Sequence, residues 1–259
     1  MTDDLRYRTA VVTGASKGIG LAVAEALVAA GADVVAVART MSPGLDILVK
    51  GGGARWVQLD LTEPDSAHHL VAAAGQHIDV LVNNVGSAQA RPGGFLSVTD
   101  AQWRRTLELN LFATIAVTRA VLPLMLETGR GSIVNIGSVN AELPDPTVVD
   151  YSAAKAALVN FSKALSKEFG PRGVRVNSVS PGPVETELWL GGGGVADTVS
   201  AAAGLEAREV MAQAAAATVS GRFSRPAEIA DLVVYLAGDR AANIIGSDLR
   251  IDGGFVPTW

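Results

Sequence analysis

The chain has 259 residues, and α/β folds often run to ~250 residues as a single domain. Its 21 basic and 26 acidic side chains give a net charge of −5 with no basic block, which predicts no nucleic-acid partner. The sequence contains no cysteine, so disulfides, a thiol nucleophile and thiolate metal sites are excluded. No apolar run approaches the ~20 residues of a membrane span, and the polar residues 1–8 are unlike a secretory signal. We therefore expect a cytoplasmic protein without a membrane partner.

Short runs rich in β-branched residues alternate along the chain with alanine-rich segments of helical period. This alternation is typical of βαβ units, which place parallel strands in one sheet. It predicts one domain over residues 1–259, an α/β fold with a doubly wound, mainly parallel, seven-stranded Rossmann-like sheet and helices on both faces. The strands are expected at Thr9–Val12, Val34–Ala38, Arg55–Gln58, Val80–Val82, Ser132–Ile136, Arg175–Val179 and Asp248–Ile251.

Four segments have the spacing or the start and stop residues of helices. They are residues 19–30, stopped by Gly31; a segment after Thr62 with Pro64 in its first turn, running toward Gln76; Asn110–Glu127; and Asp150–Phe169. A further segment, Leu188–Ala217, combines the glycine run Gly191–Gly194 with an alanine-rich stretch. Long insertions of this kind are either functional or disordered, so a substrate flap and a disordered surface excursion are both open.

The first strand is followed directly by the glycine-rich turn Thr13-Gly14-Ala15-Ser16-Lys17-Gly18-Ile19-Gly20, which opens the first helix. Glycines allow the backbone to approach a pyrophosphate closely, and the free N–H groups of the helix start stabilise its charge. The turn therefore indicates a dinucleotide site, although a purely structural glycine turn would have the same sequence.

Polar residues also follow the third and fourth strands. Asp60-Leu61 ends the third strand, and Asn83-Asn84-Val85-Gly86 ends the fourth. Ligands of open α/β sheets bind at the carboxyl ends of the strands, so these residues are candidates for the same site. Each pair could equally form a turn, because Asp and Asn side chains commonly bond to their own backbone.

Tyr151 and Lys155 are four residues apart on a predicted helix, and Ser138 comes just after the fifth strand. A free phenol titrates near ~10, so it needs a nearby cation to exchange protons readily at neutral pH. Lys155 could lower the pKa of Tyr151 by up to about three units. The alternative is a surface tyrosine and lysine that happen to be one turn apart.

The ordered set of these motifs resembles the short-chain dehydrogenase/reductase family from about Arg8 to Gly254. In chain order the set is the glycine turn, Asp60, Asn-Asn-x-Gly, Asn110, Ser138, Tyr-x-x-x-Lys and Pro181-Gly182. The resemblance implies that Tyr151 protonates a substrate carbonyl oxygen and that Ser138 hydrogen-bonds the same oxygen. Lys155 would lower the Tyr151 pKa and hold the nicotinamide ribose, while Asn110 would position a water linking Lys155 to solvent. Val85 and Gly137 stand where the family usually has alanine and serine.

The same resemblance gives the residues expected to contact the cofactor. They are Gly14, Ser16, Lys17, Gly18, Ile19, Gly20, Arg39, Asp60, Leu61, Asn84, Val85, Gly86, Tyr151, Lys155, Pro181, Gly182, Val184 and Thr186. The second strand ends in Arg39 without the acidic residue that favours NAD(H), and Arg39 with Lys17 would suit a 2′-phosphate. We therefore expect NADP(H), unless both cations are simply solvated surface charges.

These observations predict an NADP(H)-dependent oxidoreductase acting on a ketone or secondary alcohol. The alternatives are a non-catalytic dinucleotide-binding protein of the same fold and a nucleotide-sugar epimerase or dehydratase, whose larger substrate domain is not evident here. His68, His69 and His77 are expected on the surface, and no metal is predicted. Leu188, Trp189, Leu190 and Val195 suggest a partly apolar substrate, and the alanine-rich helices and the resemblance suggest a homotetramer.

Overall fold

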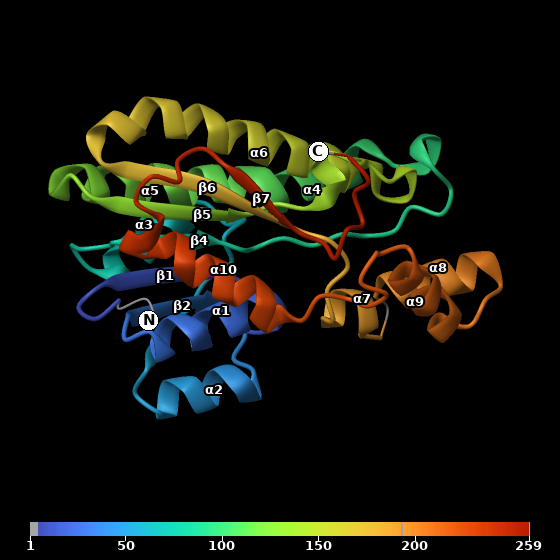
Figure 1. The fold of residues 1–259 in the computed structure, drawn as a ribbon, viewed down its shortest axis with the longest axis horizontal. Helices are drawn as coiled ribbons and strands as arrows, with labels where there is room; N and C mark the ends of the chain where they lie inside the picture. Colours follow the sequence, from blue (N-terminus) through green and yellow to red (C-terminus); the bar gives the residue numbers. More distant parts are fainter. Residues whose placement is uncertain (1–4, 193, 259) are drawn as a thin grey trace.

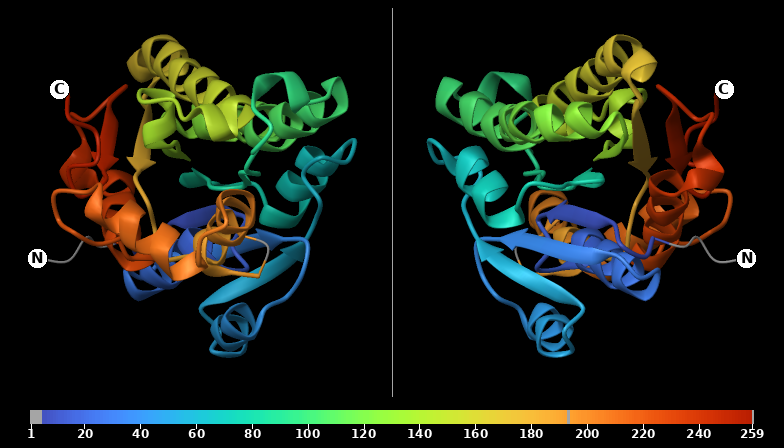
Figure 2. Two further views of the ribbon diagram at one scale, coloured as in Figure 1. Left: turned by 90° about the vertical axis from the view of Figure 1, so that its right-hand side faces the viewer. Right: turned by 90° about the vertical axis from the view of Figure 1, so that its left-hand side faces the viewer.

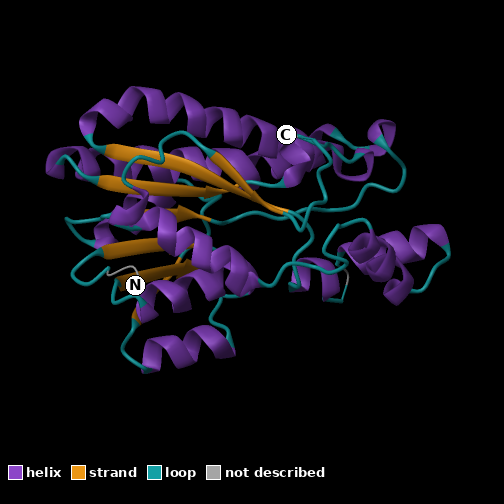
Figure 3. Cartoon of the chain, viewed as in Figure 1, coloured by secondary structure: helices purple, strands orange, loops and turns teal. Residues whose placement is uncertain are grey.

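The computed structural model describes residues 5–192 and 194–258, so the polar residues 1–4, Gly193 of the expected glycine run, and residue 259 lie outside the described residues. Seven strands form one sheet in the order β3-β2-β1-β4-β5-β6-β7, and every neighbouring pair is parallel. Helices cover both faces of this sheet (Figure 1 and Figure 3). The predicted doubly wound α/β fold is confirmed, with a sheet that is wholly parallel.

All seven strands lie where the apolar runs predicted them, with ends that differ by no more than two residues. They are β1 Thr9–Thr13, β2 Asp33–Ala38, β3 Ala54–Gln58, β4 Val80–Asn83, β5 Gly131–Ile136, β6 Val174–Pro181 and β7 Asp248–Ile251. In register, Val11 of β1 lies opposite Val35 of β2 and Leu81 of β4. These side chains are fully buried, as expected for strands covered on both faces.

The helices form two layers, seen end-on in Figure 2. Their bounds are α1 Gly18–Ala29, α2 Pro43–Lys50, α3 Ser66–Ala74, α4 Asp100–Leu107, α5 Ala113–Thr128, α6 Val149–Phe169, α7 Glu187–Leu190, α8 Val195–Ala203, α9 Ala207–Ala216 and α10 Pro226–Ala237. On one face α1 and α10 pack against each other over a core that includes Leu27 and Val233. On the other, α3 and α5 contribute Leu70 and Val121 to a second core.

Two predicted helices have the wrong bounds. The helix expected after Thr62 begins at Ser66, because Asp60 accepts hydrogen bonds from the Thr62 backbone N–H and hydroxyl and holds this stretch as a turn. The helix expected over Asn110–Glu127 begins ten residues earlier. Thr99 and Gln102 form a capping box at the start of α4, and a π-helical turn, Glu108–Phe112, joins α4 to α5.

The joined helix Asp100–Thr128 is, within the described residues, one that is long and apolar enough to cross a membrane by length and composition. The sequence predicted no apolar run of that length, and it predicted that this helix begins only at Asn110. Val117, Val121 and Met125 of this helix are buried in the second core under the sheet. Its apolar character is therefore explained by packing within the protein.

The expected flap consists of short helices at the carboxyl ends of the strands. α7, α8 and α9 form an extension on the right of Figure 1, between β6 and α10. The Trp189 ring packs edge-on against Phe223, with 5.2 Å between the ring centroids. The segment is therefore folded in this structure, which argues against a disordered excursion for its described part.

Candidate active site

The glycine-rich turn lies where the chain leaves β1, next to the end of β4. Gly14 and Gly18 have positive φ values of 65° and 56°, which glycine adopts without strain. A Cβ on Gly20 would overlap the carbonyl of Gly14, so this position needs glycine. Asn84 ties the two strand ends together, since its Nδ2 donates to the carbonyls of Thr13 and Gly14 at 3.0 and 3.2 Å. The turn and the Asn-Asn segment are thus one unit.

The remaining residues of the turn are close to the segment after β6. Ile19 packs on the first core, and the Ser16 carbonyl accepts a hydrogen bond from the Ser42 hydroxyl. Lys17, expected as a second cation for a 2′-phosphate, forms an ion pair with Glu187 at 2.6 Å. The pair joins residues 170 positions apart in the chain, and both side chains are largely exposed.

Arg39 lies at the carboxyl end of β2 with 71% of its side chain exposed. Its guanidinium is 3.7 Å from the Asp60 carboxylate. Hydrogen bonds from Thr62 hold the pKa of Asp60 below its usual range, and Arg39 lowers it further. Leu61 is buried in the second core, and Val85 packs against the same core. Arg39 is thus an exposed cation at the carboxyl end of β2.

Asn110 lies in the π-helical turn and is almost completely buried. Its Nδ2 donates to the carbonyls of Ser87 and Thr106, and its Oδ1 accepts from the Ser87 backbone N–H. A Cβ on Gly86 would lie 2.7 Å from Asn110 Oδ1 and 3.4 Å from Lys155 Nζ. Glycine at this position therefore leaves the space in which Asn110 and Lys155 come together.

Tyr151 and Lys155 face the same region from α6, and Lys155 Nζ is 5.6 Å from the centre of the Tyr151 ring. Lys155 Nζ donates to the carbonyl of Ile136 at 2.7 Å, and burial lowers its pKa to about 8. Burial raises the pKa of Tyr151, and a hydrogen bond with Ser138 opposes this rise. The expected lowering of the Tyr151 pKa by Lys155 is wrong for this structure, because the ammonium group lies beside the ring and bonds to the backbone.

The segment after β6 closes the other side of the site. A Cβ on Gly182 would lie 2.9 Å from the backbone of Asp252, so the chain passes close to the end of β7 here. Pro181 and Val184 are buried. The Thr186 methyl group would lie 3.2 Å from a Cβ on Gly18. This segment and the glycine turn, far apart in the sequence, are therefore adjacent.

A buried ion pair beside Tyr151 was missed by the sequence reading. Arg91 donates from Nη2 and Nε to Asp150 Oδ2, at 2.7 and 3.2 Å, and the two side chains are 8% and 1% exposed. The Thr106 hydroxyl donates to the same oxygen, and the Tyr151 backbone N–H donates to Oδ1. The pKa of Asp150 is lowered, since these hydrogen bonds and the Arg91 charge outweigh the cost of burial. The sequence shows Asp150 in the first turn of a predicted helix, but it does not show that Arg91, 59 residues away, is its partner.

The carboxyl edge of the sheet thus joins a glycine turn suited to a pyrophosphate with a half-buried phenol, a hydroxyl and a buried lysine suited to proton transfer. This combination defines a dinucleotide-binding oxidoreductase. A family model described as enoyl-(acyl carrier protein) reductase matches residues 14–256. The chain belongs to the short-chain dehydrogenase/reductase family, as its motifs predicted.

Named relatives cover nearly the whole chain. The 3-oxoacyl-[acyl-carrier-protein] reductase FabG of Escherichia coli is 35% identical over 95% of this chain and 96% of its own. D-threitol dehydrogenase of Mycolicibacterium smegmatis is 38% identical over 96% and 92%. A Beutenbergia cavernae protein thought to be an NAD(P)-dependent gluconate 5-dehydrogenase, with NADP bound at low occupancy, superimposes with a TM-score of 0.86 at 35% identity, over 98% of this chain and 99% of its own. The relatives are oxidoreductases with different substrates.

Proposed function

We propose that the protein is an NADP(H)-dependent oxidoreductase that transfers a hydride between nicotinamide and a small ketone or secondary alcohol, with Tyr151 as general acid and base. The observation that carries the proposal is the cluster of the half-buried Tyr151 with the buried Ser138, Lys155 and Asn110 beside the glycine turn. A non-catalytic binding protein would have no need of a phenol and a hydroxyl hydrogen-bonded to each other beside a buried lysine.

The site fits the cofactor at the positions where a side chain would fill it. A Cβ on Gly18 would crowd Thr186, and one on Gly86 would crowd Asn110, so glycine at these positions keeps the backbone accessible to a ligand. The residues proposed to hold NADP(H) are Gly14, Ser16, Lys17, Gly18, Ile19, Gly20, Arg39, Asp60, Leu61, Asn84, Val85, Gly86, Tyr151, Lys155, Pro181, Gly182, Val184 and Thr186. When bound, the nicotinamide supplies the hydride, and the protein supplies the proton.

In the direction of reduction, the Tyr151 hydroxyl gives its proton to the carbonyl oxygen as the carbonyl carbon is reduced, leaving an alcohol and a phenolate. Tyr151 is protonated at neutral pH, since burial raises its pKa, so it holds the proton that the carbonyl oxygen takes. Ser138 orients the same oxygen and stabilises the phenolate left behind. Lys155, whose pKa is about 8, can then pass a proton back toward Tyr151. Asn110, which lies near Lys155, can order a water that links Lys155 to solvent.

Replacing Tyr151 with phenylalanine tests this mechanism. Tyr151→Phe should lower turnover at least ~10²-fold, the usual effect of losing a general acid, while NADPH binding measured by fluorescence stays unchanged. Tyr7→Phe is the matched control, since Tyr7 is 98% exposed. Near-normal turnover in Tyr151→Phe would contradict the assignment.

Three further properties belong to the proposal. We expect a homotetramer with α5 and α6 at an interface, supported by the exposed Phe112 at the start of α5. Light scattering that shows a monomer at micromolar concentration would contradict this assembly.

We expect the 188–217 flap, in the single 1–259 domain, to close over the substrate, with Leu188 and Val195 contacting the apolar part of the substrate. Hydrogen exchange in this segment should slow in the ternary complex. We also expect the enzyme to work in the cytoplasm.

A further inference from the structure

A cavity of about 220 Å³ lies between the segment after β4 and the start of α8. Its walls are Ala88, Gln89, Ala90, Arg91, Gln102, Gly194, Val195 and Thr198. Both walls are at the carboxyl edge of the sheet, on the right of Figure 1. The cavity is next to the proposed reaction centre, because Arg91 in its wall bonds directly to Asp150, the residue before Tyr151. The cavity is therefore placed to hold the part of a substrate that extends from the reacting carbon.

The cavity carries no uncompensated charge. Arg91 is the one ionisable residue among its walls, and Asp150 neutralises it in the buried ion pair. The Arg91 backbone N–H is also bonded, to the Thr147 carbonyl at 2.6 Å. A carboxylate or phosphate entering the cavity would have to compete with Asp150 for Arg91 and would leave that aspartate buried and unpaired. The cavity therefore favours a neutral ligand.

The hydrogen bonds already formed inside the protein determine what its walls can still offer. Gln89 Oε1 accepts from Arg91 Nη1 at 3.1 Å, and Gln102 Oε1 accepts from the Thr99 backbone N–H at 2.8 Å. Both glutamines therefore have their Nε2 groups left as donors. The Thr198 hydroxyl donates to the Gly194 carbonyl at 2.9 Å, so its lone pairs are left as acceptors. The two amide donors and the Thr198 acceptor around this cavity could each bind a ligand hydroxyl group, because a hydroxyl both accepts and donates hydrogen bonds.

We propose that the substrate is a neutral polyhydroxylated carbonyl compound, a short ketose or the corresponding polyol, whose hydroxyl groups bind Gln89, Gln102 and Thr198. The proposal rests on the reductase function proposed above and names its substrate class. The apolar wall is limited to Ala88, Ala90 and Val195, which suits the carbon chain of a ketose. A long acyl chain would leave the two amide donors without partners, which disfavours it.

The test compares ketones that differ in a single property, with NADPH oxidation as the readout. Erythrulose and 2-butanone both have four carbons but differ in hydroxyl groups; fructose and 5-ketogluconate both have six but differ in charge; acetoacetyl-coenzyme A represents acyl substrates. We expect kcat/KM for erythrulose to exceed that for 2-butanone at least ~10-fold, and fructose to exceed 5-ketogluconate. A higher kcat/KM for 2-butanone, 5-ketogluconate or the thioester would overturn the proposal.

Gln89→Met tests whether Gln89 binds a substrate hydroxyl group. The variant should fold normally, because Gln89 is exposed on a loop and methionine keeps the length of the side chain. It should raise KM for erythrulose ~3- to 10-fold, the usual effect of one neutral hydrogen bond, with little change in kcat or in 2-butanone kinetics. Gln213→Met, on the exposed side of α9, is the matched control. An unchanged KM for erythrulose in Gln89→Met would also overturn the proposal. If NADPH bound but none of the five substrates was reduced, the reductase function itself would be contradicted.

Discussion

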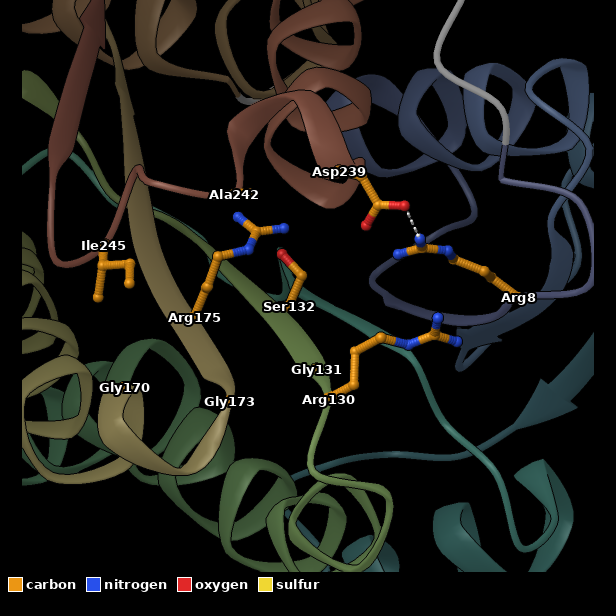
Figure 4. A pocket seen from close by; sticks show the side chains of 10 residues that line it. All are labelled: Arg8, Arg130, Gly131, Ser132, Gly170, Gly173, Arg175, Asp239, Ala242 and Ile245. Atoms are coloured by element: carbon orange, nitrogen blue, oxygen red, sulfur yellow. Dashed lines mark hydrogen bonds and ion pairs between the residues drawn. The ribbon is translucent and has the colours of Figure 1, made fainter.

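The two edges of the sheet both contain basic side chains, but these side chains are paired differently. At the amino edge, Arg8, Arg130 and Arg175 surround a cavity of about 220 Å³ (Figure 4). Arg8 pairs with Asp239 at 2.6 Å, Arg130 pairs with Asp79 at 2.8 Å, and Arg175 donates to the Gly238 carbonyl at 3.1 Å. At the carboxyl edge, no carboxylate within the described residues pairs with Lys155.

This difference separates charges that hold the fold from the charge to which we assign a role in proton transfer. Arg8 and its neighbours lower the pKa of Asp239, so that carboxylate stays ionised and bound at the amino edge. At the carboxyl edge, burial without a counter-charge lowers the pKa of Lys155 to about 8, into the range where a proton can be exchanged near neutral pH. The Arg91–Asp150 pair is the buried ion pair of the carboxyl edge, and it lies directly beside Tyr151.

The largest change in stability is expected when the Arg91–Asp150 ion pair is broken. Asp150→Ala would leave the Arg91 guanidinium buried without its carboxylate, which should lower the free energy of unfolding at pH 7 by about 3 to 5 kcal/mol in urea titrations. Because the native pKa of Asp150 is lowered, its contribution is complete above its ordinary pKa and is lost as the pH falls through the lowered value. The gap between wild type and variant should therefore shrink in acid.

Asp100→Ala is the matched control, since Asp100 is also a first-turn helix aspartate near an arginine but is 90% exposed. It should cost less than about 1 kcal/mol. The double variant Arg91→Met/Asp150→Leu should recover part of the lost stability, because it removes the unpaired charge. Equal stability of Asp150→Ala and Asp100→Ala would show that burial does not distinguish these pairs.

The second expected effect concerns Lys155. Its native pKa of about 8 is below the ordinary 10.5, so between these values the unfolded chain binds a proton that the native protein does not. The stability of the wild type should therefore rise with pH through this range, relative to Lys155→Met, by about 3 kcal/mol. Lys163→Met, on the exposed side of the same helix, should follow the wild type. A constant difference between wild type and Lys155→Met from pH 7 to 10 would contradict a buried, unpaired Lys155.

Much of the fold could be predicted because the signals are local. Seven β-branched runs marked seven strands, and since ligands of such sheets bind at the carboxyl ends, the residues after β1, β4 and β5 were candidate site residues. The predicted starts of two helices were wrong because nearby side chains bond to the backbone. The Asp60 side chain holds Thr62 in a turn, and the Thr99–Gln102 capping box starts α4 before the expected helix.

The rest of the site depends on contacts between distant parts of the chain. Glu187 neutralises Lys17 across 170 residues, and Arg91 meets Asp150 across 59. No spacing rule reports such pairs. The direction of the Lys155 side chain was also hidden, since four-residue spacing puts it on the same helix face as Tyr151 but does not say that its ammonium bonds to Ile136.

A smaller effect is expected at the exposed part of the carboxyl edge. Arg39→Asp should reverse a preference for NADPH over NADH, because it removes a charge-assisted contact of ~1.5 to 3 kcal/mol, or roughly ten- to a hundredfold. The nearby Asp60 carboxylate, 3.7 Å from Arg39, would add to the repulsion of a 2′-phosphate. Arg172→Asp makes the same charge change at the amino edge, where it should leave the preference unchanged. Equal kcat/KM with both cofactors in the wild type would refute the role of Arg39.

The smallest effect is expected at the amino edge. The Arg130 side chain is 59% exposed, so water solvates its charge and salt screens its pairing with Asp79. Asp79 keeps a second partner, because its Oδ2 accepts from the Thr9 backbone N–H at 3.0 Å. Arg130→Met should therefore change the free energy of unfolding by about 0 to 1 kcal/mol, with kcat and KM unchanged. A loss above about 2 kcal/mol would mean that the arginines around this cavity act as one network, and that exposure alone does not set the strength of an ion pair at this edge.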